Sequence, residues 1–160
     1  MSRVVAPSEI RGVLLPLQTG QLLLPNATVS EVVGYTKPES RKEGAPDWLL
    51  GDFSWRQQKV PLISFETLTG SSPEEVGHRA RIAICNTLNG NDKLPYIGIL
   101  LKAIPHLVRV TRDSVAPLGE EGDAGSMVAG QVKIAGKEAW IPDLDSLEMA
   151  LGDVLDELSR

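Results

Sequence analysis

The amino-acid sequence predicts a mostly β protein made of two similar β subdomains and one C-terminal helix. Three features of the sequence support this class: short apolar segments divided by turn residues, a pattern repeated along the chain, and a single stretch of helical periodicity. Such short segments, separated by Gly, Pro, Asn and Asp, suit a sandwich or barrel better than a helical bundle. The chain has 160 residues, the length of one ordinary domain, so we expect residues 1–160 to form a single domain.

The apolar segments and the breaks between them give the expected strand order. Residues 18–20 read as a hairpin turn between two of these segments, 36–47 as a loop, and 71–75 as a polar linker or a helix start. The expected strands are 13–17, 21–24, 29–33, 53–55, 59–65, 81–85, 95–101, 103–111, 127–135 and 137–141.

The C-terminal residues carry the only firm helical pattern. Apolar residues recur there at three- and four-residue spacing, at Leu144, Leu147, Leu151, Val154, Leu155 and Leu158. We expect Asp145 to cap the helix and Glu148 to reach back and close a capping box. Gly152 lies inside the pattern and is unfavourable in a helix interior, so it predicts a break into two helices.

A repeat at an offset of 79 residues relates the middle of the chain to its C-terminal part. The residues Gly51, Phe53, Val60, Leu62, Phe65, Glu66 and Leu68 correspond without a gap to Gly130, Val132, Ala139, Ile141, Leu144, Asp145 and Leu147. Each copy reads as a strand, a turn, an apolar strand and then an acidic residue at a helical turn. The repeat predicts two similar β subdomains; the alternative is a chance likeness of two amphipathic hairpins.

Composition and charge argue against two kinds of partner. The formal net charge is −5, and Lys and Arg are scattered singly apart from Arg41 and Lys42, so no row of cations is available for a phosphate backbone. The uninterrupted apolar runs, such as 99–101, are far shorter than a membrane span, and residues 1–11 lack a signal-peptide pattern. We therefore expect a cytoplasmic protein that binds no nucleic acid and does not insert into a membrane.

Residues able to support catalysis or metal binding are few. Cys85 is the only cysteine, and neither His78 nor His106 has a surrounding catalytic signature. Acidic residues at 120–123 do not keep the ligand spacing of a calcium loop, and Asp143 and Asp145 suit the start of a helix. We expect no catalytic residue, no metal site and no cofactor.

Binding of a protein partner is the remaining kind of function. The residues that suit it best are Trp48, Trp55 and Arg56, in a chain that is only 4% aromatic. Tryptophan and arginine dominate the energetics of protein interfaces, and an arginine at a hairpin tip beside a tryptophan is well placed to anchor a partner. A core tryptophan with a solvated arginine explains the same residue types equally well. Residue type alone leaves both interpretations open.

The segment from Gly44 to Ile63, GAPDWLLGDFSWRQQKVPLI, resembles the central signature of the CheW-like family. In that signature a proline, an aromatic residue and a glycine precede an Asn-aliphatic-Arg-Gly turn, which is followed by Val-Pro and an apolar strand. Further segments that look like parts of the family lie at 24–25, 29–33, 98–101, 127–130 and 141–147. The resemblance implies a fold of two intertwined five-stranded, SH3-like β-barrel subdomains, which agrees with the repeat.

The resemblance also implies a function and a set of contact residues. Such domains are non-catalytic adaptors that couple the cytoplasmic tips of chemoreceptors to the regulatory domain of a CheA-type histidine kinase. By this likeness, Arg56 matches the signature arginine of the coupling surface, and Glu31 with Val29 matches another part of it. Trp55 joins these three residues as the fourth expected partner contact.

The sequence departs from the family pattern inside the same segment. Ser54 replaces an expected Asn, Gln57 a Gly and Ser64 an Asp, and Asp52 occupies a usually apolar place. Because a left-handed turn position disfavours residues other than glycine, Gln57 predicts a different turn and a different aim for Arg56. These departures point to an accessory member of the family, for example one in a type IV pilus chemosensory system. The alternative function is a small β-barrel protein that binds a ligand or cofactor in the groove between the subdomains.

Overall fold

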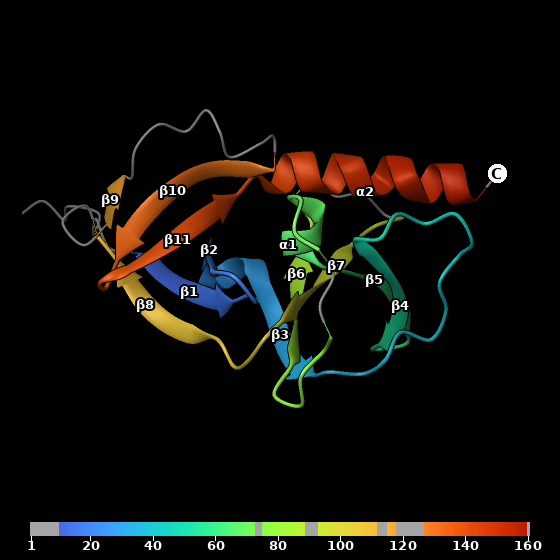
Figure 1. Cartoon of the computed structure of the whole chain (residues 1–160), viewed down its shortest axis with the longest axis horizontal. Helices are drawn as coiled ribbons and strands as arrows, with labels where there is room; N and C mark the ends of the chain where they lie inside the picture. The colour runs from blue at the N-terminus through green and yellow to red at the C-terminus, as the bar shows by residue number, and fades with distance from the viewer. Residues whose placement is uncertain (1–9, 73–74, 89–92, 112–114, 118–126, 160) are drawn as a thin grey trace, which may run out of the picture.

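The computed structural model describes residues 10–72, 75–88, 93–111, 115–117 and 127–159, and most of its regular structure is β (Figure 1). The strands are β1 (Ile10–Pro16), β2 (Gln21–Pro25), β3 (Val29–Gly34), β4 (Leu49–Trp55), β5 (Gln58–Ile63), β6 (Arg81–Asn86), β7 (Tyr96–Leu101), β8 (His106–Val110), β9 (Val115–Pro117), β10 (Val128–Ile134) and β11 (Lys137–Pro142). The helices are η1 (Asn26–Thr28), α1 (Phe65–Leu68) and α2 (Leu144–Leu158).

The strands form two sheets whose segments alternate along the chain. One sheet has the order β8-β1-β2-β11-β10-β9 and the other has the order β3-β6-β7-β5-β4. The first sheet therefore combines strands from both ends of the chain, and the second is inserted between them. This confirms the expected mostly β fold of two intertwined subdomains, with the short β9 as a sixth strand that the sequence did not reveal.

Most expected strands are present, with shifted ends. β4 begins at Leu49 rather than at residue 53, because the apolar positions 49, 53 and 55 all face the core and extend the strand backwards. The strand expected at 103–111 is shortened to β8, and residues 102–105 link the two sheets instead. Phe65, which was expected to end the strand 59–65, is instead the first residue of α1.

The repeat at 79 residues is a structural repeat. Leu49↔Ile63 corresponds to Val128↔Pro142, and Trp55↔Gln58 corresponds to Ile134↔Lys137. The β-bulge between Leu49 and Gly51 recurs between Val128 and Gly130. Since a register slip of one residue would turn every side chain to the opposite face, this agreement makes chance similarity an inadequate explanation.

The helices that follow the two hairpins begin at equivalent residues. Ser64 caps α1 by accepting from the Thr67 N–H, and Asp143 caps α2 by accepting from the Ser146 N–H at 3.0 Å. The prediction that Asp145 caps α2 is wrong, because the helix already begins at Leu144 and Asp145 lies in its first turn. The predicted break at Gly152 is also wrong: α2 is continuous from 144 to 158, since its apolar face packs along its whole length.

The helix α2 continues from one sheet and packs against the other subdomain. Figure 1 shows it running from the end of β11 across the side of the molecule that carries α1, β5 and β4. Its buried Leu147 and Leu151 share one core cluster with Leu22 of β2 and Ile63 of β5. Burying a leucine side chain contributes about 1.5–3 kcal/mol, so this cluster stabilises the two sheets as one unit.

Two buried glutamates link the subdomains in a reciprocal way. Glu66 of α1, which follows the five-stranded sheet, accepts from the Gln18 N–H in the β1–β2 turn at 2.6 Å. Glu148 of α2, which follows the six-stranded sheet, accepts from the Leu88 N–H after β6 at 2.9 Å. Both glutamates are only 6% exposed. Glu148 therefore binds a loop of the other sheet instead of closing the predicted capping box.

Replacing Glu148 by alanine should destabilise the protein by about 1–3 kcal/mol, because a buried N–H loses its charged acceptor. The exposed Glu157 on the same helix is the matched control, and Glu157→Ala should change the free energy of unfolding by less than about 0.5 kcal/mol. Urea unfolding followed by tryptophan fluorescence measures both variants. Equal stability of the two variants would contradict the link between the sheets.

Candidate protein-binding surface

The β4–β5 hairpin carries Arg56 at its tip. Arg56 and Gln57 have φ values of 48° and 65°, the positive values that a two-residue type I′ turn requires at both positions. The equivalent turn of the repeat, Ala135-Gly136, has φ values of 52° and 75°. Gln57 therefore adopts the left-handed conformation that its residue type disfavours, and the strand register on both sides holds it there. The expected change of turn and of Arg56 aim relative to the family stays a prediction.

Arg56 is held in place on the surface. Its guanidinium carbon lies 4.6 Å from the centre of the Trp55 ring, and its Nη2 donates to Glu31 Oε1 at 3.3 Å. The Arg56 side chain remains 67% exposed, so the remaining guanidinium donors face solvent. An arginine that is already ordered loses less entropy when it binds a partner.

The Trp55 ring packs against the Arg56 guanidinium and is itself fixed by its neighbours. Trp55 is only 7% exposed, its Nε1–H donates to the same Glu31 oxygen at 2.9 Å, and the Tyr96 ring contacts the indole edge-to-face with centroids 4.8 Å apart. Glu31 lies on β3 and Trp55 on β4, the two edges of the five-stranded sheet. This contact shows that the sheet curls until its edges meet, as a barrel requires.

Val29 lies apart from this cluster. It is half-buried at the start of β3 and lines an open groove of about 400 Å³ between the edges of the two sheets. Ile104 and Leu107, which are 58% and 73% exposed, lie along the same groove. The structure thus brings together Arg56, Trp55 and Glu31 and leaves Val29 at a second, apolar surface. Sequence reasoning did not single out Ile104, in the link before β8, or Leu107, on the edge strand β8, because exposed apolar residues look like buried ones in a sequence.

The outer edge of β4 is covered by the chain itself. Asp52 exchanges backbone hydrogen bonds with the loop, donating to the Ser40 carbonyl at 2.8 Å and accepting from the Glu39 N–H at 2.7 Å. The Ser54 hydroxyl donates to the Glu39 carboxylate at 3.0 Å. The Ser54 side chain therefore has a local partner, whereas Asp52 makes its bonds to the loop through its backbone. An edge paired in this way is not open for a partner strand.

The described residues hold no catalytic or metal-binding cluster. Cys85 is buried in β6, and burial raises the pKa of its thiol to about 12, which keeps it protonated and unreactive at neutral pH. No group of three His, Cys, Asp or Glu side chains in the described ranges could hold a metal ion. Residues 120–123 lie outside the described residues. No helix in the described part of the chain could span a membrane.

The two intertwined β subdomains expose an ordered arginine, Arg56, and an open apolar groove. This combination defines a protein-interaction domain. The family model named CheW-like domain matches residues 11–150, so the chain belongs to the CheW-like domain family. This family consists of scaffold domains without catalytic activity, in agreement with the expectation that the chain is not an enzyme. The chain is also similar to a crystal structure of the scaffolding protein TtCheW from Thermoanaerobacter tengcongensis, with 19% sequence identity, a TM-score of 0.72 and coverage of 90% of each chain. No curated protein sequence matches the chain.

Replacing Gln57 by glycine should stabilise the protein by about 1 kcal/mol, because glycine adopts positive φ without steric cost. Gln58→Gly is the matched control one residue later: Gln58 lies in β5, where glycine should cost about 0.5–1 kcal/mol. Thermal and urea unfolding of the two variants should shift in opposite directions. Destabilisation by Gln57→Gly would show that the left-handed turn carries no strain.

Stability should depend on pH through Asp52. Its pKa is raised, chiefly because burial penalises the carboxylate, while the cations Lys59 and Lys42 oppose this shift. A carboxyl with a raised folded-state pKa destabilises the fold when ionised, so its cost is present at pH 7 and disappears as the pH falls below the unfolded value. Asp52→Asn should therefore stabilise the protein at pH 7 and lose this advantage near pH 3.5. Unfolding titrations across this range measure the difference, and a gain that is independent of pH would contradict it.

Proposed function

We propose that this protein is a cytoplasmic, non-catalytic adaptor that couples a chemoreceptor tip to the regulatory domain of a CheA-type histidine kinase. The proposal rests on membership of the CheW-like domain family and on the exposed, preorganised arginine of the β4–β5 hairpin. A scaffold needs surfaces that are ordered before the partner arrives, since ordering them during binding costs affinity. Arg56 meets that requirement, because Trp55 and Glu31 already fix it.

The single observation that carries the proposal is the shared oxygen of Glu31. Oε1 accepts from both Trp55 Nε1 and Arg56 Nη2, so one carboxylate fixes a buried ring and an exposed cation together. The guanidinium keeps donors free for a carboxylate or a carbonyl of the partner. We assign partner contact to Arg56 and Glu31, with Trp55 as the platform beneath them.

The groove at Val29 supplies a second contact surface of different chemistry. Exposed apolar side chains at Ile104 and Leu107 beside Val29 suit the apolar face of a helical partner such as a receptor tip. The groove and the Arg56 cluster both use β3, through Val29 and Glu31 respectively. The two surfaces are distinct but share one strand, which suits a protein that couples two partners.

The departures at Ser54, Gln57, Ser64 and Asp52 support an accessory member of the family, acting in chemotaxis or in pilus-mediated motility. Two of them have local side-chain roles here: Ser54 binds Glu39 in the loop along β4, and Ser64 caps α1. Residues that satisfy the chain's own backbone need not alter a partner surface. The departures thus remain compatible with an adaptor built around Arg56.

Arg56→Glu should weaken binding to the kinase regulatory domain or to the receptor fragment by about tenfold or more, because it reverses the charge at the contact. Lys137→Glu is the matched control, since Lys137 is exposed beside the equivalent turn of the other hairpin. Isothermal titration calorimetry against each purified partner measures the change. Unchanged binding of Arg56→Glu to every partner would contradict the assignment, provided that its unfolding midpoint matches the parent protein.

A ligand-binding β-barrel is the second candidate function, and the size of the groove at Val29 favours it. Its volume of about 400 Å³ lies within the range of small-molecule sites. However, Leu107 is 73% exposed on its wall, whereas ligand sites bury most of the surface of their ligand. Native mass spectrometry of the purified protein distinguishes the two functions: a stoichiometric copurifying small molecule supports the ligand site, and its absence together with partner binding supports the adaptor.

A further inference from the structure

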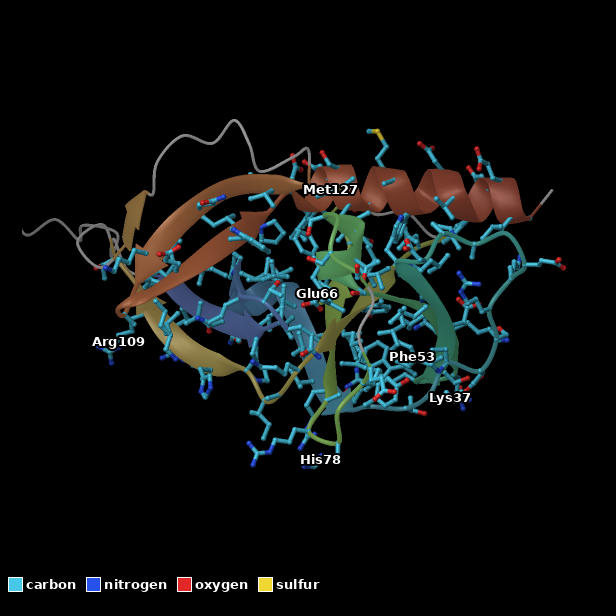
Figure 2. All side chains as sticks on the ribbon, in the orientation of Figure 1. Lys37, Phe53, Glu66, His78, Arg109 and Met127 are labelled. Carbon is cyan, nitrogen blue, oxygen red and sulfur yellow. The ribbon has the colours of Figure 1, made fainter. Side chains whose placement is uncertain are left out.

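A second hollow, separate from the Arg56 cluster and from the groove at Val29, lies where the two subdomains meet. It has a volume of about 300 Å³. Its lining residues are Gln18, Glu75, Gly77, His78, Arg79, Lys102 and Ala103. Figure 2 shows His78 at the edge of the molecule away from α2. Cationic and donor side chains predominate here, although the chain as a whole has a net charge of −5.

The backbone that carries His78 and Arg79 is fixed. The two residues are the centre of a turn closed by the Ala80 N–H donating to the Gly77 carbonyl at 3.2 Å. The Arg81 guanidinium clamps the same turn, since its Nη1 donates to the Arg79 carbonyl at 2.8 Å and to the Ala80 carbonyl at 2.9 Å. Ala80 is buried and anchors the turn to β6.

The opposite wall of the hollow is fixed as well. The Lys102 N–H donates to the Pro16 carbonyl at 2.9 Å, which ties the start of the β7–β8 link to the end of β1. Gln18 is held through its own N–H by the buried Glu66 carboxylate. The donors of the hollow therefore project from two walls whose main chains are hydrogen-bonded into the fold.

The cations of the hollow have no partner in the described part of the chain. Neither Arg79 nor Lys102 forms an ion pair with a carboxylate of the described residues. Among the described residues, Glu75 is the one carboxylate that lines the hollow, and it offsets part of the positive charge. An anion bound here would gain the planar guanidinium donors, the ammonium of Lys102 and the amide of Gln18.

We infer that this hollow binds a phosphate monoester, that is, a phosphoryl group attached to an organic carrier. A doubly charged oxyanion with three acceptor oxygens matches this set of donors and overcomes the single charge of Glu75. The volume equals that of about ten water molecules, which exceeds the need of a bare phosphate ion. The remaining space accommodates the carrier.

Bound phosphate would bridge the two subdomains. Gln18 belongs to the β1–β2 turn of one sheet, while Arg79 leads into β6 of the other, and Lys102 starts the link between the sheets. A ligand that binds only the folded arrangement stabilises it. This site is independent of the proposed adaptor role, because it shares no residue with the Arg56 cluster.

Titration of the isotope-labelled protein with O-phosphoserine and, separately, with inorganic phosphate tests the inference by NMR. We expect saturable shifts of the Gln18, Arg79 and Lys102 amides, with tighter binding of O-phosphoserine than of inorganic phosphate. Arg79→Ala and Lys102→Ala should each weaken binding of O-phosphoserine by about tenfold, and Glu75→Gln should tighten it. Lys137→Ala, which removes a cation at the far hairpin, should leave the affinity unchanged.

Three results would overturn the inference. The first is the absence of saturable shifts at these amides in the parent protein. The second is the same shifts produced by sodium chloride at matched ionic strength, which would mean general screening. The third is equal or tighter binding of inorganic phosphate, which would rule out a group borne on a carrier.

Discussion

The two buried glutamates are the interaction on which the rest of the structure depends. Each of these residues, Glu66 and Glu148, lies in the helix that follows one sheet. Its carboxylate accepts a hydrogen bond from a backbone N–H in a hairpin loop of the other sheet. Charge-assisted hydrogen bonds of this kind are roughly twice as strong as neutral ones. Because the two bonds run in opposite directions between the sheets, neither subdomain completes its own hydrogen bonding without the other.

This reciprocity explains where the proposed binding surfaces lie. Joining the sheets at their helices leaves the far end of the five-stranded sheet exposed, and the β4–β5 turn projects Arg56 there. The same junction leaves an apolar groove beside β3 and a cationic hollow at Lys102. One scaffold thus offers three surfaces of different chemistry.

The two halves of the repeat share a register but not their surroundings. The outer edge of β10 pairs with β9, whereas the outer edge of β4 pairs with the loop at Ser40. The equivalent turns carry Arg56-Gln57 in one copy and Ala135-Gly136 in the other. Since internal registers are constrained by burial and surface positions are not, a duplicated fold can keep its core and diverge at its edges.

By itself the sequence determined the hairpins, their 79-residue repeat and the family signature, and it singled out Arg56 as a candidate contact. These features follow from local patterns, because alternation, turn residues and periodicity act within a few positions of one another. Only the tertiary structure decided that Trp55 is a buried platform, that Val29 lies apart from Arg56, and that Glu148 binds Leu88 rather than its own helix start. Each of these depends on groups separated by many residues, and no local pattern reports which distant loop a buried carboxylate meets. The two left-handed residues of the Arg56 turn show the same limit: strand register set by the whole sheet overrode the local preference for glycine.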